Sequence, residues 1–393
     1  MTNRLGPREI LDVLVGFPTV SSDSNLPLID WVDTYLASHG IQAHRHYDAT
    51  QEKASLFAHV GPMKEGAVLL SGHTDVVPVQ GQPWGTDPFT VVERDGKLFG
   101  RGTCDMKGFD ALAIWAMVEA KYAQVTRPLQ LALSYDEEVG CLGAPEMIDA
   151  MQPVLPKASA VIVGEPSMMQ VVTGHKGSFG YHVHIQGFEV HSSLVHTGVN
   201  AIMYGAKLIE WVNDVNAANM ARQPSDAASI FTPPFTTAHV GTIHGGTAHN
   251  ITAKDCHFDL DFRLVPDENM TQWRDALFAK VDEIQAQMQA VVPSTKIVLQ
   301  QKFHIPALAP EDQGTAEMLL RQLTGDNAAQ VVSYGTEGGQ FQEAGYSAAI
   351  CGPGHIEQAH QPNEYLTVAQ FQAGQTFMVR LLDHLQSDVG QRL

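Results

Sequence analysis

The segment LALSYDEEVG, residues 131–140, is an apolar run that ends in three consecutive carboxylates. A short run that is apolar on both faces is typical of a central strand covered by helices on each side. The carboxylates are Asp136, Glu137 and Glu138. Adjacent side chains of an extended chain point in opposite directions, and like charges beside a core are costly. We therefore expect a cation to neutralise the group, with one glutamate binding it and its neighbour acting as a general base.

Three further apolar runs have the same character: GAVLLSGH (66–73), ASAVIVGE (158–165) and YSAAICG (346–352). Helical patterns lie between and after them, notably MKGFDALAIWAMVEAKYA (106–123) and LTVAQFQAGQTFMVRLLDHL (366–385). The first of these helices is apolar on almost every side and is expected to be buried. Strands and helices arranged in this way predict an α/β domain with a central sheet flanked by helices.

The middle of the chain has a different pattern. Apolar and polar residues alternate strictly in DCHFDLDFRL (255–264) and in YHVHIQG (181–187). Period-two strands with one wet face indicate an antiparallel sheet. With helices at about 198–213 and 269–288 and a last strand near 296–301, they predict an inserted α+β domain of βαββαβ, ferredoxin-like order. The expected domain bounds are 1–179 and 302–393 for the two parts of the α/β domain, and 180–301 for the inserted one.

The composition limits the classes of partner and compartment. A length of 393 residues favours two domains, and a formal net charge of −19 disfavours nucleic acid and anionic membranes as partners. The four cysteines are scattered and form no C-x-x-C pair, which fits a reducing compartment. Glu9 and Asp12 interrupt the apolar stretch that a signal peptide needs, and no run approaches the roughly 20 apolar residues of a membrane span. We expect a soluble, cytoplasmic protein.

Potential metal ligands stand at the points where the apolar runs end. In open α/β sheets, binding sites lie at the carboxyl ends of the strands. A single carboxylate after a strand is usually a solvated loop residue or a helix cap, but several gathered at one sheet edge need a cation. Histidine and carboxylate ligands without cysteine suit Zn²⁺, Co²⁺ or Mn²⁺, and two metals with a shared bridging carboxylate would account for so many ligands. The candidates are His73, Asp75, Asp105, Glu137, Glu138 and Glu165.

Five motifs resemble those of the dinuclear metallo-aminoacylase and carboxypeptidase family, which includes acetylornithine deacetylases, succinyl-diaminopimelate desuccinylases and aminoacylases. They are SGHTDVVPV, GRGTCDMKG, DEEVGCLGA, GEP and CGPGHIEQAHQPNEYL, and they occur in the family's order along the whole chain. The last motif most resembles acetylornithine deacetylases. The resemblance implies a metallopeptidase-type catalytic domain with a mixed central sheet, and an inserted domain that serves as a lid and forms a homodimer.

The resemblance also implies a role for each motif residue. His73 and Glu165 would hold one divalent metal ion, Glu138 and His360 the other, and Asp105 would bridge the two; Asp75 would fix the His73 tautomer, and Glu137 would move the proton. Zinc is the expected metal, with cobalt or manganese as alternatives. A cis peptide bond between Asp105 and Met106 is implied as well.

Substrate contacts are implied mainly for the inserted domain. His191 in FEVHSSLVHTGVNAI would reach the partner subunit's site and stabilise an oxyanion, with His196 as the alternative. Asn250 and Arg263 match positions that bind the substrate carboxylate or acyl group. Arg263 could instead pair with a neighbouring aspartate.

A glycine-rich segment near the C-terminus is a further candidate. Gly335 and Thr336 in YGTEGGQF lie where backbone N–H groups could cradle a carboxylate, although the segment could equally be an ordinary turn.

The expected reaction is metal-dependent hydrolysis of an N-acyl amino acid, with N2-acetyl-L-ornithine as the favoured substrate. N-acetylcitrulline, succinyl-diaminopimelate and dipeptides are alternatives within the class, and a non-catalytic metal-binding interaction protein is the alternative outside it. A serine hydrolase or a nucleotide enzyme is disfavoured because the sequence contains no G-x-S-x-G elbow and no phosphate-binding glycine motif.

Overall fold

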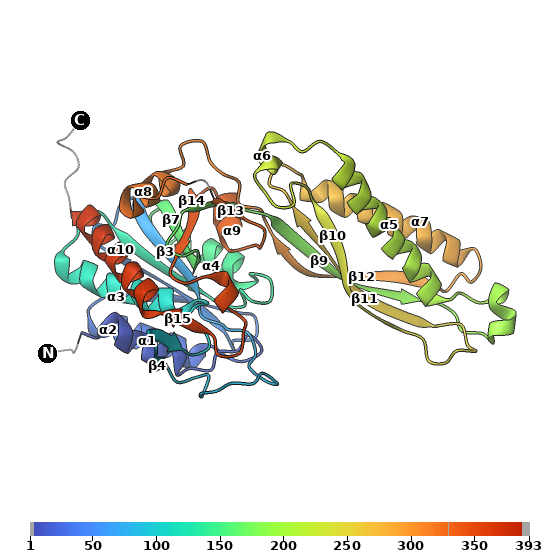
Figure 1. Cartoon of the computed structure of the whole chain (residues 1–393), viewed down its shortest axis with the longest axis horizontal. Coiled ribbons are helices and arrows are strands. Elements are labelled where there is room, and N and C mark those ends of the chain that lie inside the picture. The colour runs from blue at the N-terminus through green and yellow to red at the C-terminus, as the bar shows by residue number, and fades with distance from the viewer. Residues whose placement is uncertain (1–3, 329, 387–393) are drawn as a thin grey trace. The chain divides into compact units, whose positions relative to one another are not determined.

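The computed structural model describes residues 4–328 and 330–386, and it divides the chain into two compact units (Figure 1). Unit 1 consists of Met1–Gly174, Leu308–Val331 and Thr336–Leu393. Unit 2 consists of His175–Ala307 and Val332–Gly335. None of the helices in the described ranges is both long and apolar enough to span a bilayer.

The described part of unit 1 is built on an eight-stranded sheet with the order β1-β2-β6-β3-β7-β14-β8-β13. The pairs β3–β6, β3–β7 and β14–β7 are parallel, whereas β1–β2, β2–β6 and β14–β8 are antiparallel. The sheet is therefore mixed, as the family resemblance implies. The strands are β1 (Ala43–Tyr47), β2 (Ala54–Val60), β3 (Ala67–His73), β6 (Leu129–Ser134), β7 (Ala158–Pro166), β8 (Val172–His175), β13 (Gln330–Val332) and β14 (Ala348–Gly352).

Helices cover both faces of this sheet. One face and its hydrophobic core are covered by α1 (Pro7–Val15), α2 (Leu26–Ser38), α3 (Lys107–Ala123), α8 (Thr315–Thr324) and α10 (Val368–Gln386). The helices α4 (Gly143–Met151) and α9 (Gly338–Glu343) contact the strands from the other side. The four apolar runs of the sequence are the central strands β3, β6, β7 and β14, whose residues are almost all buried. The predicted α/β class is confirmed.

The long buried helix α3 follows the pattern expected for residues 106–123. It is apolar on most sides because α1 and α10 pack on one side of it and the sheet on the other. The C-terminal helix begins later than the expected residue 366. Tyr365–Thr367 instead form β15, which pairs with β5 (Lys97–Phe99), and β5 pairs with β4 (Val92–Arg94). The Thr367 hydroxyl accepts a hydrogen bond from the backbone N–H of Gln370 and so caps the helix start.

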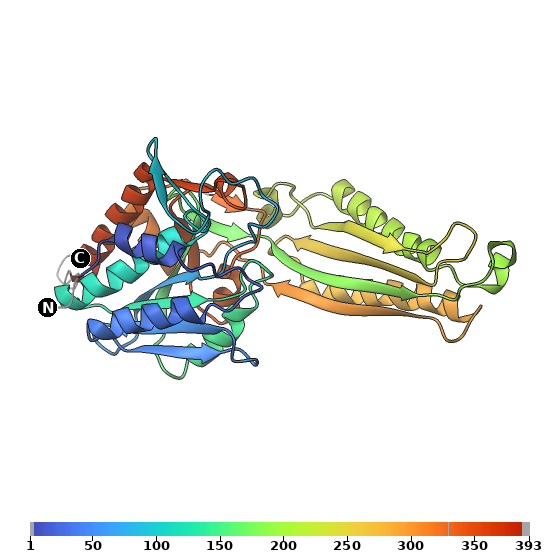
Figure 2. The same cartoon turned by 90° about the horizontal axis from the view of Figure 1, so that it is seen from below.

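The described part of unit 2 is a four-stranded antiparallel sheet with two long helices. Its order along the chain is β9, α5, β10, β11, α7, β12, which confirms the predicted βαββαβ arrangement. Both long helices lie on the same face of the sheet (Figure 2). The elements are β9 (Gly177–Gln186), α5 (Ala201–Ala221), the short α6 (Asp226–Ser229), β10 (Thr237–Gly245), β11 (Asp255–Leu264), α7 (Met270–Gln289) and β12 (Lys296–Ile305).

The alternation of β11 separates a dry face from a wet one. Its apolar residues Cys256, Phe258, Leu260, Phe262 and Leu264 are all buried in the core under α5 and α7. The intervening polar residues are half-buried or exposed on the opposite face. The helix α5 starts at residue 201, not at 198, because the Asn200 side chain accepts hydrogen bonds from the first free N–H groups.

Candidate metal centre

The candidate ligands of unit 1 lie at one edge of the sheet because four neighbouring strands, β6, β3, β7 and β14, run in the same direction. His73 is the last residue of β3, and Glu165 is the penultimate residue of β7. Glu137 and Glu138 follow β6, and His360 follows β14 and the short 3₁₀ helix η2 (Ile356–Gln358).

Asp105 joins this group from the turn before α3. The Asp105–Met106 peptide bond is cis. A close approach between α3 and β7 brings the helix start to the sheet edge, since a Cβ on Gly164 would lie 2.0 Å from Cγ of Phe109. Glycine is therefore the residue that lets this helix pack directly on the strand that carries Glu165.

The side chains form two groups around Asp105. Its Oδ1 lies 3.1 Å from Nε2 of His73, and its Oδ2 lies 3.3 Å from Nε2 of His360. His73 Nε2 is also 3.7 Å from Oε1 of Glu165, and His360 Nε2 is 2.9 Å from Oε2 of Glu138. The two oxygens of one carboxylate thus face two different histidines, each of which has a second carboxylate beside it.

The donor set fits divalent cations. Two groups of side chains each offer ligand atoms that lie within 4.8 Å of one another. One group is His73, Asp105 and Glu138, and the other is His73, Glu137 and Glu165. Oε1 of Glu138 and Oε1 of Glu165 are buried and have no hydrogen-bond donor among the described residues. A buried carboxylate oxygen without a donor is costly, and a metal ion would satisfy it.

The electrostatics of the cluster lead to the same conclusion. Burial raises the pKa of the Glu138 carboxyl to about 7 and that of Glu165 well above its usual range, and the charge of Asp105 adds to both shifts. Burial also raises the pKa of Glu137 to about 8. Hydrogen bonds to Asp105 and Glu138 raise the pKa of His360 to about 10. Without a cation, these groups therefore hold protons at pH 7 that a metal would displace.

Asp75 organises the loop after β6. Its Oδ1 accepts a hydrogen bond from the backbone N–H of Glu137 at 3.1 Å, and its Oδ2 accepts one from that of Glu138 at 3.3 Å. Oδ2 also accepts the Ser21 hydroxyl at 2.6 Å. His73 Nδ1 lies 3.0 Å from the backbone oxygen of Asp75 and 3.4 Å from its Oδ1. Without a cation the Nε2–H of His73 donates to Asp105, and a metal ion would take the place of that proton while Nδ1 keeps its bond to Asp75.

The backbone at Asp136 explains how two adjacent glutamates reach the same cluster. Asp136 has a left-handed φ of 56° and binds Lys53 Nζ through its carboxylate at 2.5 Å. The chain is therefore not extended here, and the alternation expected from a strand does not apply. Glu137 and Glu138 each have a carboxylate oxygen close to the other ligand atoms around His73.

Two carboxylates that support the centre were missed in the sequence. Glu364 is buried and accepts hydrogen bonds from the backbone N–H groups of Cys104 and Asp105, at 2.9 and 3.1 Å, and from Arg101 at 2.7 Å. Glu337 is buried and accepts the Ser134 hydroxyl. Both lie in segments that the sequence singled out, QPNEY and YGTEGGQF, but only their partners reveal what they do.

The other candidates fall in different places. In unit 2, His191 caps the 3₁₀ helix η1 (Ser192–Thr197), and His196 lies in the last turn of that helix. Asn250 is next to the start of η1, because its backbone oxygen accepts a hydrogen bond from the N–H of Ser192. Arg263 Nε lies 3.3 Å from Oδ2 of Asp261, which is the alternative pairing considered from the sequence.

The glycine-rich segment is divided between the units. Gly335 belongs to unit 2, whereas Thr336 is buried in unit 1 and its hydroxyl accepts the N–H of Gly338. Thr336 therefore contributes to the turn before α9.

Comparisons with known proteins agree with one another. The model of peptidase family M20/M25/M40 matches residues 69–384. An acetylornithine deacetylase of Myxococcus xanthus is 34% identical over 389 residues, which cover 96% of this chain and 97% of that protein. An M20 family metallo-carboxypeptidase from Sulfolobus solfataricus has a TM-score of 0.78 at 16% identity, over 97% of this chain and 99% of that one. A dinuclear metal-binding M20 peptidase from Bacillus subtilis has a TM-score of 0.63 at 14% identity, over 97% of both chains. The resemblance indicated by the sequence motifs is confirmed.

We predict that the metal-free protein becomes less stable as the pH rises. The raised carboxyl pKa of Glu138 contributes stability that is lost between its ordinary 4.5 and about 7. The raised imidazole pKa of His360 contributes stability that is lost between its ordinary 6.5 and about 10. Both shifts have the same sign: at each of these two groups the folded chain binds more protons than the unfolded chain. Thermal unfolding of chelator-treated protein should therefore have a lower midpoint at about pH 9 than at about pH 5.

Zn²⁺ supplied at the higher pH should raise the midpoint again and flatten its pH dependence, because the metal takes the place of the protons. A metal-free midpoint that stays constant or rises over this interval would contradict the assignment.

Proposed function

Because the chain belongs to peptidase family M20/M25/M40, a family of metal-dependent hydrolases, we propose that it hydrolyses the amide bond of N2-acetyl-L-ornithine to L-ornithine and acetate. The 34% identity to an acetylornithine deacetylase over almost the whole chain supports this substrate. The observation that carries the reaction type is the placement of Asp105, whose two oxygens face His73 and His360. A carboxylate between two imidazoles is suited to bridging two metal ions.

The proposed ligands are those that the motif resemblance implies, and the distances among them support the proposal. His73 and Glu165 would hold one divalent ion, Glu138 and His360 the other, and Asp105 would bridge them. Zn²⁺ is the proposed metal, with Co²⁺ or Mn²⁺ as alternatives, because all five ligands are imidazoles or carboxylates. When bound, such ions polarise the amide carbonyl and acidify the attacking water.

Glu137 is the proposed general base and acid. Its carboxylate would accept a proton from the attacking water and then donate it to the nitrogen of the leaving amine. Asp75 holds the Glu137 backbone N–H, so the carboxylate is presented from a fixed loop. Burial raises the pKa of Glu137 to about 8 in the metal-free chain, and bound cations would lower that pKa toward the range that a base needs.

We predict that Glu137→Gln lowers kcat by about 10²–10⁴-fold, since a glutamine cannot exchange the proton. Metal content and the thermal unfolding midpoint should stay close to those of the unaltered enzyme. The matched control is Asp136→Asn, which changes the neighbouring carboxylate to a residue that also tolerates the left-handed backbone. Its kcat should fall far less. A Glu137→Gln enzyme that keeps most of its kcat would refute the role.

The substrate contacts are proposed from the motif matches. His191 would stabilise the oxyanion of the tetrahedral intermediate, and Asn250 and Arg263 would bind the substrate carboxylate or acyl group. Asn250 is close to His191, since residues 191 and 251 form a β-bridge. Gly335 and Thr336 are proposed to border the same substrate.

A panel of acyl substrates tests the proposed specificity. Acetylornithine should have a kcat/KM at least about tenfold above that of N-acetylcitrulline, succinyl-diaminopimelate and dipeptides, because matched polar contacts discriminate between close analogues. Zn²⁺-loaded and Co²⁺-loaded enzyme should show the same order. Release of free amino acids from dipeptides at the highest rate would point to a peptidase instead, and no turnover of any substrate would favour the interaction protein.

We also propose that unit 2 acts as a lid and joins two copies into a homodimer. Phe188 forms a bridge with Val199 and His191 forms one with Ile251, and large apolar side chains in and around these segments are exposed. Exposed apolar residues that gather in this way mark interaction sites. The residues are Phe188, Leu194, Val195, Ile202, Met203, Ile243 and Ile251.

The dimer is tested by two measurements. Met203→Glu should shift the sedimentation mass from dimer to monomer, whereas Met63→Glu, an equally exposed methionine of unit 1, should leave it unchanged. Subunits with His191→Ala and subunits with Glu137→Gln should each be almost inactive alone. After exchange of equal amounts, the mixture should recover about a quarter of the normal rate, because about half of the dimers are hybrids and each hybrid has one complete site of two. No recovery on mixing would show that His191 does not act on the partner's site.

A further inference from the structure

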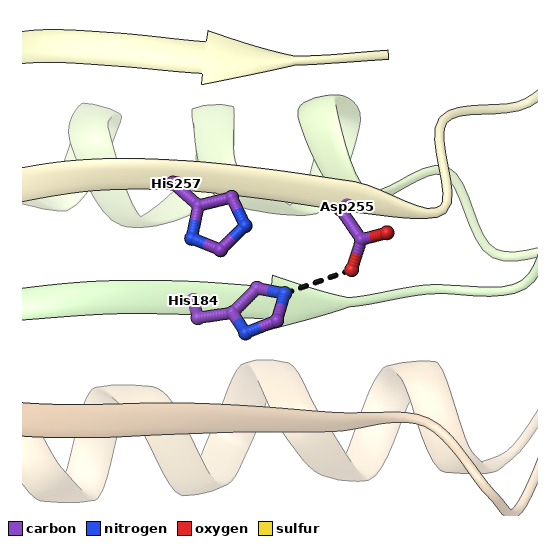
Figure 3. Close-up of side chains that lie close together, drawn as sticks. All are labelled: His184, Asp255 and His257. Atoms are coloured by element: carbon purple, nitrogen blue, oxygen red, sulfur yellow. Dashed lines mark hydrogen bonds and ion pairs between the residues drawn. The ribbon is translucent and has the colours of Figure 1, made fainter. Parts of the chain in front are cut away.

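Three polar side chains converge on the wet face of the unit 2 sheet: His184, Asp255 and His257, here called the sheet-face triad (Figure 3). His184 and His257 are directly opposite each other on the antiparallel strands β9 and β11. Asp255 lies two residues along β11 from His257, and so points to the same face. Opposite residues of such a pair have Cβ atoms about 4.5–5.5 Å apart, which is short enough for two imidazoles to share one ligand.

The observed distances are close to those that a cation site requires. His184 Nε2 and Asp255 Oδ1 are 2.8 Å apart, and the two imidazole rings stack with their centroids 3.8 Å apart. One ligand atom from each residue lies within 4.8 Å of the other two. Tetrahedral zinc with bonds of about 2.0–2.1 Å requires ligand atoms roughly 3.3 Å apart, so small side-chain rotations suffice.

We propose that the sheet-face triad binds a divalent transition-metal ion, with Zn²⁺ as the ion of choice. Two imidazoles and one carboxylate are borderline ligands, which favour zinc over Mg²⁺ or Ca²⁺. The fourth coordination position is open to water. The ion would link β9 to β11 and stabilise unit 2, whereas the centre proposed for hydrolysis belongs to unit 1.

The surroundings of His257 hold it in the form that a metal requires. His182 Nδ1 lies 2.8 Å from Oδ1 of Asp259, and its Nε2 lies 3.1 Å from Nδ1 of His257. If Nδ1 of His182 donates to the carboxylate, its Nε2 accepts the proton of His257 Nδ1, and Nε2 of His257 keeps a lone pair. A chain of carboxylate, imidazole and imidazole of this kind orients metal-binding histidines.

His184 needs a change of tautomer, together with a turn of the Gln186 amide. In the metal-free chain its Nε2–H donates to Asp255, and its Nδ1 lies 3.1 Å from the Gln186 amide nitrogen. On metal binding, Zn²⁺ takes the position of the proton between His184 Nε2 and Asp255. That proton moves to Nδ1, where the Gln186 amide oxygen accepts it after the amide group turns over. The net proton count of the triad does not change.

The alternative is a hydrogen-bonded polar surface that binds no metal. The metal site and the metal-free polar surface predict different numbers of bound zinc ions, so the test counts bound zinc per full-length chain. Protein whose unit 1 centre is already saturated is dialysed against free Zn²⁺, and the bound metal is measured by atomic emission. The unaltered protein should hold one zinc more than His184→Gln or Asp255→Asn. The matched control His239→Gln removes an exposed histidine of the neighbouring strand β10, outside the triad, and should keep the additional zinc.

Affinity and spectroscopy give independent measures. His182→Ala, which removes only the supporting histidine, should weaken the additional zinc by roughly 10–100-fold, and loss of a direct ligand should weaken it more. Imidazole NMR signals of His184 and His257 should shift on addition of Zn²⁺, and that of His239 should not. Equal zinc content in the unaltered protein and both triad variants would overturn the proposal, as would unshifted signals of His184 and His257.

Discussion

Carboxylates at the ends of neighbouring strands repel one another at a place that water hardly reaches. The direction of β6, β3 and β7 forces this encounter, because the carboxyl ends of parallel strands share one edge. The raised pKa values of Glu137, Glu138 and Glu165 reflect the free-energy cost of holding these charges together in a buried place. The buried oxygens of Glu138 and Glu165 that lack a donor show the same cost in the geometry. The arrangement is stable when positive charge is present among these side chains. The strand order of unit 1 therefore brings the carboxylates together, and their repulsion in turn creates the need for a cation.

Residues around the cluster hold it in one geometry. Asp75 fixes the loop of Glu137 and Glu138 through two backbone N–H groups, and Glu364 fixes the turn of Asp105 in the same way. Each of these carboxylates is satisfied by donors and so differs from Glu138 and Glu165, which each keep a buried oxygen without a donor among the described residues. Arg101, buried against Glu364, keeps that support neutral overall. Rigid support of this kind holds ligand positions to the accuracy that metal geometry requires.

Most of the fold could be predicted from the sequence, because hydrophobic periodicity is a local signal. The alternation in residues 255–264 gave the strand β11 at both ends, and the ligands at the ends of the apolar runs followed from strand direction. His360 was found only through its motif, since a single histidine in a loop carries no periodic signal. Glu364 could not be assigned, because its partner Arg101 is 263 residues away in the chain. The sheet-face triad could not be predicted, because that requires the register of β9 against β11, which a period-two pattern does not supply.

The two clusters respond differently to the absence of metal. The candidate ligands of unit 1 are mostly buried, so their charges are compensated chiefly by protons or by cations. In the sheet-face triad, Asp255 is about half exposed, and its hydrogen bond to His184 satisfies both side chains without a metal. Water and that hydrogen bond compete with zinc at the triad, whereas in unit 1 the competitors are protons and the contacts of His360 with Asp105 and Glu138. A site of three ligands on an open face should consequently exchange its ion more readily than a mostly buried centre. Its contribution to the stability of unit 2 should rise and fall with the free zinc concentration.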